Sequence, residues 1–144
     1  MPTPPKTIVI TAADEQYVAL AQDLIDSLKA QPCKAPFDIG LLDVGLTPQS
    51  RMNFSRQNVH IETAQSDIEF PVREAWEKEK PGFRTLTARP FLRRYFPGYD
   101  VYIWIDADIW VQTPEAIDAM MASASGSNAI HLACEFDRSY LTTP

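Results

Sequence analysis

Residues 101–112 read Val-Tyr-Ile-Trp-Ile-Asp-Ala-Asp-Ile-Trp-Val-Gln, and this stretch decides the fold class. Five consecutive apolar or aromatic residues lead into two aspartates, Asp106 and Asp108, and three more apolar residues follow. Such a run, rich in β-branched and aromatic side chains, is typical of a strand buried on both faces of a parallel sheet. The two carboxylates therefore fall at the carboxyl end of a strand, where open α/β sheets bind their ligands.

Asp106 and Asp108 have two interpretations. Two like charges this close repel each other unless a cation lies between them, which points to a metal or phosphate site. The other interpretation is a solvated pair of turn-forming aspartates. Because 11 of the 144 residues are aspartate, about one Asp-x-Asp tripeptide is expected by chance. Only its position after an apolar strand is informative, and position alone leaves the two interpretations even.

Length and composition indicate a single domain, residues 1–144, or part of a larger one. A hydrophobic share of 45% and an aromatic share of 10% are ordinary for a chain that buries a core. The formal net charge of −6 argues against a nucleic-acid partner. Any basic surface would have to be local, and residues 84–94 form the one segment dense in arginine.

Cysteine usage and the amino terminus both predict a cytoplasmic protein. Cys33 and Cys134 are about a hundred residues apart and lack metal-ligand spacing, so we expect reduced thiols. Residues 1–6 contain no apolar region ahead of a cleavage site, so no secretory signal is expected. The longest apolar runs are far too short for a transmembrane segment.

The order of predicted elements is that of a three-layer α/β/α sandwich around a mostly parallel sheet. Strands are predicted at residues 7–11, 37–44, 59–61, 101–105 and 129–134, with residues 109–111 continuing extended. Helices are predicted at residues 17–28, 49–57 and 85–96 and after Thr113, with N-caps at Asp14, Thr47, Thr87 and Thr113 respectively. Pro48, Pro90 and Pro114 lie at or near the starts of the second, third and fourth helix.

Two parts of the chain stay open at this stage. Residues 65–83 have no clean periodicity and are predicted to be a mobile excursion from the sheet. Such a segment is either a lid or acceptor-binding loop or a surface insertion with no role. Asp14 and Tyr17 could likewise do no more than cap and pack a helix. His60 is expected to be a solvent-facing or satisfied side chain rather than a ligand.

Three separated segments together resemble the N-terminal part of a GT-A type glycosyltransferase, closest to the glycogenin-like family of bacterial galactosyl- and glucosyltransferases (family 8). Thr11-Ala12-Ala13-Asp14-Glu15-Gln16-Tyr17 is similar to the family's opening strand and nucleotide-base loop. Ala88-Arg89 on a helix is the second segment, and residues 101–108 resemble the aspartate signature with its small central residue. The resemblance covers most of the chain, although residues 65–84 match only loosely.

This resemblance implies a Rossmann-like nucleotide-diphospho-sugar transferase fold and a UDP-sugar donor. Asp14 and Gln16 would then hydrogen-bond the uracil and the ribose, and Tyr17 would stack on the base. Ala107 would keep the aspartate turn narrow, so that its backbone approaches the ribose. Arg89 would supply positive charge near the phosphates or the donor sugar.

The resemblance also implies a metal. Asp106 and Asp108 would hold Mn²⁺ or Mg²⁺, because hard cations favour oxygen ligands. The cation would bridge the two phosphates and neutralise charge on the departing diphosphate. The implied reaction is metal-dependent transfer of a hexose from a UDP-sugar to a glycan or other acceptor.

Two departures from the family pattern shape a further expectation. Phe91 stands where many relatives carry a basic residue. The histidine that completes the family's metal site lies far downstream, and His60 and His131 are both in the wrong place for it. We therefore expect residues 1–144 to be the N-terminal part of a longer catalytic domain, incomplete at the C-terminus.

Two alternatives remain. One is a catalytically inactive fragment that binds a nucleotide-sugar. The other is a phosphatase of the haloacid-dehalogenase type, with Asp106 as nucleophile and Asp108 as acid/base. That class usually has Thr or Val after the second aspartate, where this chain has Ile109, and its strand opens the domain, whereas here four elements precede it.

Overall fold

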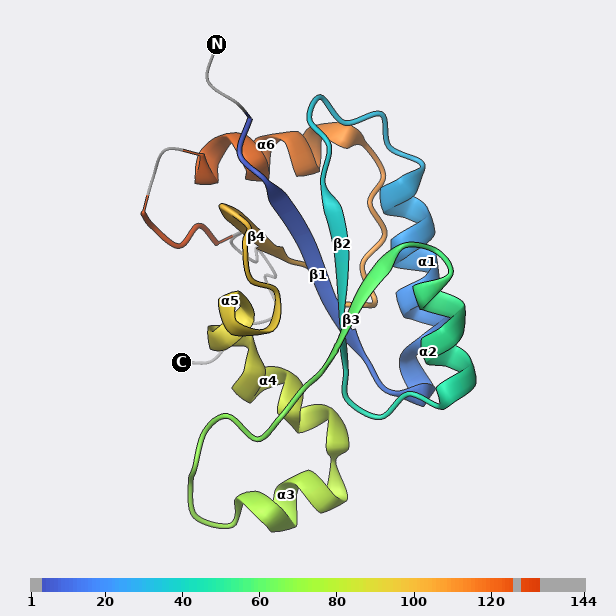
Figure 1. Cartoon of the computed structure of the whole chain (residues 1–144), viewed down its shortest axis with the longest axis vertical. Coiled ribbons are helices and arrows are strands. Elements are labelled where there is room, and N and C mark those ends of the chain that lie inside the picture. Colours follow the sequence, from blue (N-terminus) through green and yellow to red (C-terminus); the bar gives the residue numbers. More distant parts are fainter. Residues whose placement is uncertain (1–3, 126–127, 133–144) are drawn as a thin grey trace, which may run out of the picture.

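The computed structural model describes residues 4–125 and 128–132. The strands of this part form a four-stranded parallel sheet in the order β3-β2-β1-β4 (Figure 1). They are β1 (Thr7–Ala13), β2 (Asp38–Asp43), β3 (Val59–Thr63) and β4 (Val101–Trp104). The helices are α1 (Val18–Lys29), α2 (Pro48–Ser55), α3 (Arg73–Glu79), α4 (Arg84–Ala88), α5 (Leu92–Tyr95) and α6 (Pro114–Ala124), with 3-10 turns η1 (Glu15–Tyr17), η2 (Pro81–Phe83) and η3 (Arg89–Phe91).

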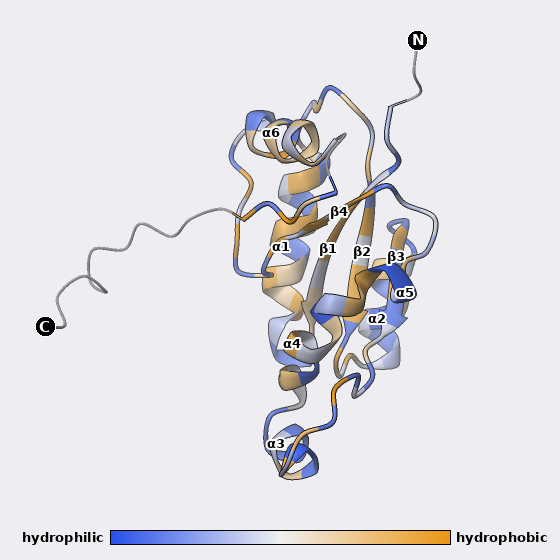
Figure 2. Cartoon of the chain, turned by 90° about the vertical axis from the view of Figure 1, so that its left-hand side faces the viewer, coloured by the Kyte–Doolittle hydropathy of each residue, from blue (hydrophilic) through white to orange (hydrophobic). Residues whose placement is uncertain are grey.

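Strand β1 lies in the interior of the sheet, with β2 on one side and β4 on the other. Its residues Ile8, Val9 and Ile10 are completely or almost completely buried. An unbroken β-branched run suits a parallel strand covered on both faces, so the first predicted strand is confirmed and extends to Ala13. In Figure 2 the strands carry hydrophobic colour along much of their length.

Two hydrophobic clusters cover the two faces of this sheet and make the predicted three layers. The larger cluster contains Leu24 and Ile25 of α1, Phe54 of α2 and Ile117 of α6. Helices α1 and α6 lie together on one side of the strands in Figure 2. The second cluster is formed by Ile8, Ile10 and Leu42 with residues of the α4–α5 segment and its C-terminal neighbours, namely Ala88, Leu92, Phe96 and Tyr99.

Strand β4 differs from its prediction in one respect. Val101 and Ile103 are buried, but Tyr102 and Trp104 are only half-buried. In the described part of the chain β4 pairs with β1 alone, and the short α4–α5 segment covers its second face incompletely. Burial on both faces was therefore the wrong expectation for this strand. Residues 109–111 lie outside the sheet, and the Val111 N–H donates to Ser27 Oγ at 3.1 Å.

The predicted helix at residues 85–96 is broken into α4, η3 and α5. Pro90 has no N–H and its ring excludes the carbonyl four residues earlier, so a regular α-helix cannot pass through it. Thr87 is not the helix cap that we predicted. It is a buried residue inside α4, and its Oγ1 donates to the carbonyl of Arg84 at 3.2 Å.

The aperiodic residues 65–83 contain the short helix α3, which lies beyond the carboxyl ends of the strands (Figure 1). Its Glu77 is buried and accepts hydrogen bonds from Ser66 Oγ at 2.6 Å and Arg84 Nε at 3.4 Å. Hydrogen bonding to Ser66, ahead of the contact with Arg84, holds the pKa of Glu77 below its usual value. The rings of Phe70 and Trp76 pack on Phe83. This segment leaves the sheet, as predicted from the sequence, and forms a small packed lobe with a short helix that the sequence did not predict.

The starts of helices α2 and α6 agree with their predictions, whereas the predicted strand at residues 129–134 is not found in its described part. Thr47 caps α2 by accepting from the Ser50 N–H. Helix α6 begins after Thr113 with Pro114 at its first position, although the Thr113 side chain makes no capping hydrogen bond. Residues 129–132 form no strand, and Cys134 lies outside the described residues. No helix within the described ranges is long and apolar enough to cross a bilayer.

Candidate functional site

Two segments chosen from the sequence meet at the carboxyl edge of the sheet. Strands β1 and β4 run parallel with Ile10 opposite Trp104, and the Ile105 N–H continues the pairing to the Ile10 carbonyl at 3.0 Å. The segment after β1 carries Asp14, Gln16 and Tyr17, and the segment after β4 carries Asp106 and Asp108. Because the two strands are adjacent and parallel, both segments leave the same edge, where sheets of this class bind ligands.

Asp14 caps the turn that follows β1. Its Oδ1 accepts from the N–H groups of Gln16 at 2.9 Å and Tyr17 at 3.2 Å. The capping interpretation is therefore confirmed for this oxygen, whereas Oδ2 has no hydrogen-bond partner among the residues that the structure describes. The side chains of Gln16 and Tyr17 are exposed, and 49% of the tyrosine is accessible to solvent. The turn therefore presents a carboxylate oxygen, an amide and an aromatic ring.

Glu15 ties this turn to the start of α2, which sequence reasoning missed. Its carboxylate accepts from the Thr47 N–H and from Ser50 Oγ, both at 2.8 Å. The Thr47 N–H, and then the Ser50 hydroxyl, lower the pKa of Glu15. The Glu15 N–H also donates to the Gly45 carbonyl at 3.2 Å. These contacts hold the backbone around Gln16 and Tyr17 in place.

Arg89 contacts Asp106 from the helical layer that contains the second hydrophobic cluster. It lies at the junction of α4 and η3, and its Nη2 donates to Asp106 Oδ1 at 3.0 Å. The guanidinium also lies 4.3 Å above the centre of the Trp104 ring. Its Nε is buried and has no partner in the described part of the chain. Arg89 is therefore held in place by Asp106 and Trp104, and its Nη2 bond to Asp106 leaves further N–H donors on the guanidinium.

Trp104 is the second residue that sequence reasoning missed. Its Nε1 donates to Asp106 Oδ1 at 2.7 Å, so the same oxygen accepts from both Trp104 and Arg89. The signal was present in the sequence, because side chains two residues apart on an extended chain point to the same face. Trp104 and Asp106 have this spacing.

Asp106, Ala107 and Asp108 form a turn in which the central residue is buried and the two aspartates are exposed. Ala107 is buried in the larger core cluster, whereas Asp106 and Asp108 are exposed on either side of it. The Ile109 N–H closes the turn on the Asp106 carbonyl at 3.1 Å. Asp108 has no side-chain partner among the described residues. A small residue at Ala107 fits its place against the core. Asp108 and the Oδ2 atom of Asp106 face outward and could bind a ligand, whereas Oδ1 of Asp106 is engaged with Arg89 and Trp104.

Mn²⁺ or Mg²⁺ fits this set of donors only together with a second ligand. Within residues 4–125 and 128–132 no three His, Cys, Asp or Glu side chains form a group that could hold a metal. Asp106 and Asp108 supply two carboxylates, and Mg²⁺-type sites commonly use one or two carboxylates plus substrate phosphates. Their oxygens suit a hard cation. The donor set therefore matches a metal–diphosphate complex better than a free ion.

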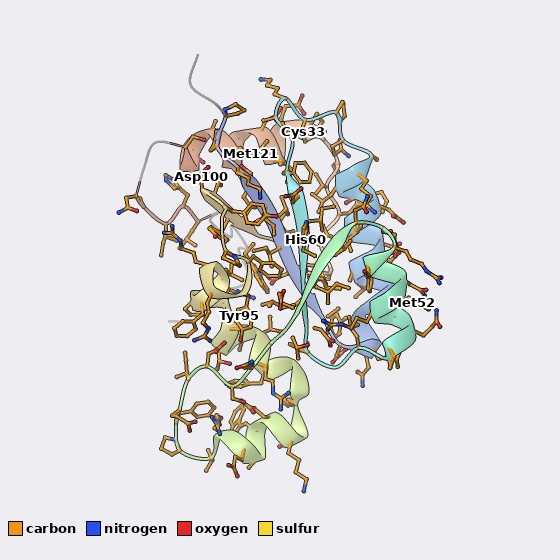
Figure 3. All side chains as sticks on the ribbon, viewed as in Figure 1. Cys33, Met52, His60, Tyr95, Asp100 and Met121 are labelled. Carbon is orange, nitrogen blue, oxygen red and sulfur yellow. The ribbon has the colours of Figure 1, made fainter. Side chains whose placement is uncertain are left out.

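The other candidates from the sequence lie apart from this edge. His60 is exposed on β3, at the far side of the described sheet from β4, as predicted for a solvent-facing side chain (Figure 3). His131 is exposed in the segment after α6. Phe91 is half-buried, and the Arg94 guanidinium lies 4.9 Å from its ring centre. Neither histidine stands on the two segments that carry the aspartates.

An open hollow of about 410 Å³ at the amino end of β2 is not a competing site. It is lined by residues that include Lys29, Cys33 and Gln57, and Cys33 lies far from the carboxyl edge in Figure 3. Burial raises the pKa of the Cys33 thiol, which keeps it protonated and unreactive. Lys29 Nζ is already engaged with the carbonyl and side chain of Gln57 at 3.0 and 3.2 Å.

Comparison with known proteins shows the fold. No family model and no curated protein matches this sequence. The chain is similar to the galactosyltransferase LgtC, solved in complex with donor and acceptor sugar analogues, with a TM-score of 0.52 and 19% identity over 70% of this chain and 37% of LgtC. It is also similar to the bifunctional glycosyltransferase WbbM in its apo form, with a TM-score of 0.53 and 19% identity over 81% of this chain and 21% of that one.

These likenesses define the class of fold. The α/β sheet in the order β3-β2-β1-β4 is similar to the N-terminal part of LgtC, a family 8 galactosyltransferase, and of other GT-A glycosyltransferases. The chain spans little more than a third of the length of LgtC. The fold predicted from the sequence is therefore confirmed, at low sequence identity.

Proposed function

We propose that this chain is the nucleotide-sugar-binding part of a glycosyltransferase that moves a hexose from a UDP-sugar to a glycan or other acceptor. One observation carries the proposal. Arg89, the turn after β1 and the Asp106–Asp108 turn meet at the carboxyl edge of a sheet similar to that of LgtC. The stability of an α/β fold does not require an arginine, two carboxylates and an exposed tyrosine to lie together at one edge of the sheet.

The turn after β1 supplies the groups for the nucleoside. The exposed Tyr17 ring has the size and shape to stack on uracil. Asp14 Oδ2 and the side-chain amide of Gln16 make no hydrogen bond to another described residue, and they would bind the base and the ribose. Glu15 holds these three residues through Thr47 and Ser50, so little order has to be gained on binding.

The Asp106–Asp108 turn and Arg89 supply the groups for the diphosphate. Mn²⁺ or Mg²⁺, when bound there, would neutralise the negative charge that builds up on the diphosphate as it leaves the sugar. Asp106 and Asp108 would hold that ion, and the backbone at Ala107 would lie against the ribose. The Nη groups of Arg89, whose side chain is 39% exposed, would donate to a phosphate or donor-sugar oxygen.

The lobe of residues 65–83 supports a role at the same edge. A Cβ at Gly82 in η2 would lie 3.9 Å from Asp14 Oδ2, so the lobe returns beside the proposed nucleoside site. Trp76 on α3 is 48% exposed. This placement favours a wall of the donor or acceptor site over a surface insertion with no role.

An inactive nucleotide-sugar-binding fragment is the second candidate function. It is favoured by the lack, among the described residues, of a third His, Cys, Asp or Glu that joins Asp106 and Asp108 in a group able to hold a metal. No observation favours the phosphatase alternative. Binding and turnover must therefore be measured separately, and a fragment would bind UDP with metal but release no UDP from a UDP-hexose.

Calorimetric titration of UDP with and without Mn²⁺ tests the proposal. Wild type should bind UDP only when Mn²⁺ is present, and Asp108→Ala should lose that binding. Asp23→Ala is a matched control, since Asp23 is exposed on α1 and bonds to no side chain in the described ranges. Binding without metal, no binding at all, or an Asp108→Ala protein that behaves like wild type would each overturn the proposed role of the aspartates.

A further inference from the structure

We propose that Trp104 is the positioning residue of this site. Its indole N–H holds the Asp106 carboxylate and its ring face holds the Arg89 guanidinium. The effect on donor binding rests on the proposed function above, whereas the arrangement of these three side chains does not. Trp104 would touch neither the nucleotide nor the metal, and would act through Asp106 and Arg89.

The strand gives Trp104 a defined place. It is the last residue of β4 and stands opposite Ile10, which is fully buried. Its ring packs against the second core cluster, which includes Ala88, the neighbour of Arg89. The indole is therefore anchored on its apolar side, while its N–H reaches the exposed carboxylate two residues further on.

Trp104 helps Arg89 to order the exposed carboxylate of Asp106. The Asp106 side chain is 61% exposed, and its Oδ1 accepts from Trp104 at 2.7 Å and from Arg89 at 3.0 Å. Both donors use the same oxygen, which leaves Oδ2 for a ligand. Hydrogen bonds to a metal-binding carboxylate orient it, and they raise affinity because less side-chain entropy is lost on binding.

The ring face gives Arg89 a support that does not depend on Asp106. A cation bound to Asp106 would repel the guanidinium and compete for the same carboxylate. The contact with Trp104, 4.3 Å from the ring centre, is a cation–π interaction and persists when that ion pair is lost. Arg89 would then remain beside the site with its donors free for a phosphate.

The first experiment examines the free protein and needs no ligand. The chain has three tryptophans, and Trp76 and Trp110 are exposed, with no indole hydrogen bond among the described residues. In a ¹⁵N-labelled sample the indole signal that Trp104→Phe removes should shift in Asp106→Ala and stay in place in Asp108→Ala. An indole signal of Trp104 that does not respond to Asp106→Ala would overturn the proposal, whatever the protein binds.

The second experiment measures binding of UDP with Mn²⁺ by calorimetry. Trp104→Phe keeps a ring for Arg89 and loses the N–H. We expect an affinity about fivefold to tenfold weaker, the size of one ordinary hydrogen bond, because the loss would reach the ligand only through Asp106. Trp104→Leu loses both contacts and should bind more weakly still. Trp110→Phe is the control and should match wild type.

The outcomes separate this proposal from the proposed function. If wild type does not bind UDP with Mn²⁺, the proposed function fails, and the indole shifts still decide whether Trp104 holds Asp106. If wild type binds and folded Trp104→Phe and Trp104→Leu bind equally well, the positioning role is wrong and the proposed function stands. The Asp106→Ala shifts are read with Trp104 intact, so a Trp104 variant that fails to fold does not remove the test.

Discussion

Arg89 and Asp106 form an ion pair across 17 positions of sequence, with Nη2 3.0 Å from Oδ1. Both side chains are partly exposed, 39% for the arginine and 61% for the aspartate. Ion pairs at such exposure contribute at most about 1 kcal/mol, so this pair adds little to stability. It does place a positive charge on the carboxylate that would receive a metal–diphosphate complex. A pair this weak can be exchanged for a divalent cation at small cost.

Arg89→Ala should therefore affect the binding of UDP and of free Mn²⁺ differently. Loss of the guanidinium removes a charged donor for the phosphates, so we expect UDP affinity in the presence of Mn²⁺ to fall about tenfold. Free Mn²⁺ should bind no more weakly, because a competitor for Asp106 is gone. Calorimetry with each ligand measures both effects. Arg93→Ala, an exposed neighbour whose guanidinium lies 5.9 Å from the Tyr102 ring centre, is the control, and equal losses in the two variants would contradict a specific role for Arg89.

Substitutions of Tyr17 should separate stacking from hydrogen bonding. Tyr17→Phe keeps the ring and should bind UDP with Mn²⁺ almost as well as wild type. Tyr17→Ala removes the stacking face, and we expect a loss of about tenfold, as for other base–aromatic contacts. Thermal unfolding should change little in either variant, because the side chain is 49% exposed. Unchanged UDP affinity in Tyr17→Ala would place the base elsewhere.

Alkaline pH should weaken the fold through Tyr99. Burial, and then the hydrogen bond from its hydroxyl to Asp38 Oδ2 at 2.7 Å, raises the pKa of Tyr99 to about 12. Because the pKa is higher in the folded than in the unfolded chain, this contribution to stability is complete below pH 10 or so and is lost as the pH rises toward 12.

Denaturant unfolding at pH 8, 10 and 11.5 tests this prediction against Tyr99→Phe. The variant should be less stable at pH 8 by about 1 kcal/mol, the usual value of one hydrogen bond, and should lose less stability than wild type as the pH rises. Tyr17→Phe is the matched control, since Tyr17 is exposed. Parallel curves for wild type and Tyr99→Phe would show that Tyr99 does not carry the alkaline loss.

Val72 should be a position at which substitution stabilises the protein. It precedes α3 with φ 62° and ψ 12°, in the left-handed region that β-branched residues rarely adopt. Its side chain is 66% exposed, so little packing is lost on replacement. Val72→Asn should raise the free energy of unfolding by about 1 kcal/mol, since asparagine tolerates this conformation. Val72→Ala removes the β-branch alone and should give a smaller gain, whereas a loss of stability in both would contradict the strained backbone.

Features read from short stretches of sequence were predicted well. The β-branched residues of β1 and the cap and proline signals at Asp14, Thr47 and Pro114 indicated elements that the structure contains. Each depends on residues within a few positions of one another, where sterics and local hydrogen bonds decide the backbone. Pro90 carried an equally local signal, and treating it as part of one helix was an error of interpretation.

Features that depend on distant partners were missed. Helix α3 has no apolar periodicity, and its buried Glu77 accepts through Oε2 from Ser66 and Arg84, which lie outside the helix. The incomplete burial of Tyr102 and Trp104 reflects how little of the fold covers that face of β4. Such contacts cannot be derived from spacing along one chain segment, because they depend on which elements pack together.

The candidate site divides in the same way. The sequence by itself determined the carboxylates at the end of an apolar strand, the turn at Asp14, and a three-layer α/β class, since all follow from local periodicity and capping. Only the tertiary structure decided that Arg89 and Trp104 share one oxygen of Asp106. The physical reason is that Arg89 lies at the α4–η3 junction, in the helical layer that contains the second hydrophobic cluster. Its position depends on how that layer packs on β4 rather than on residues next to it in the sequence.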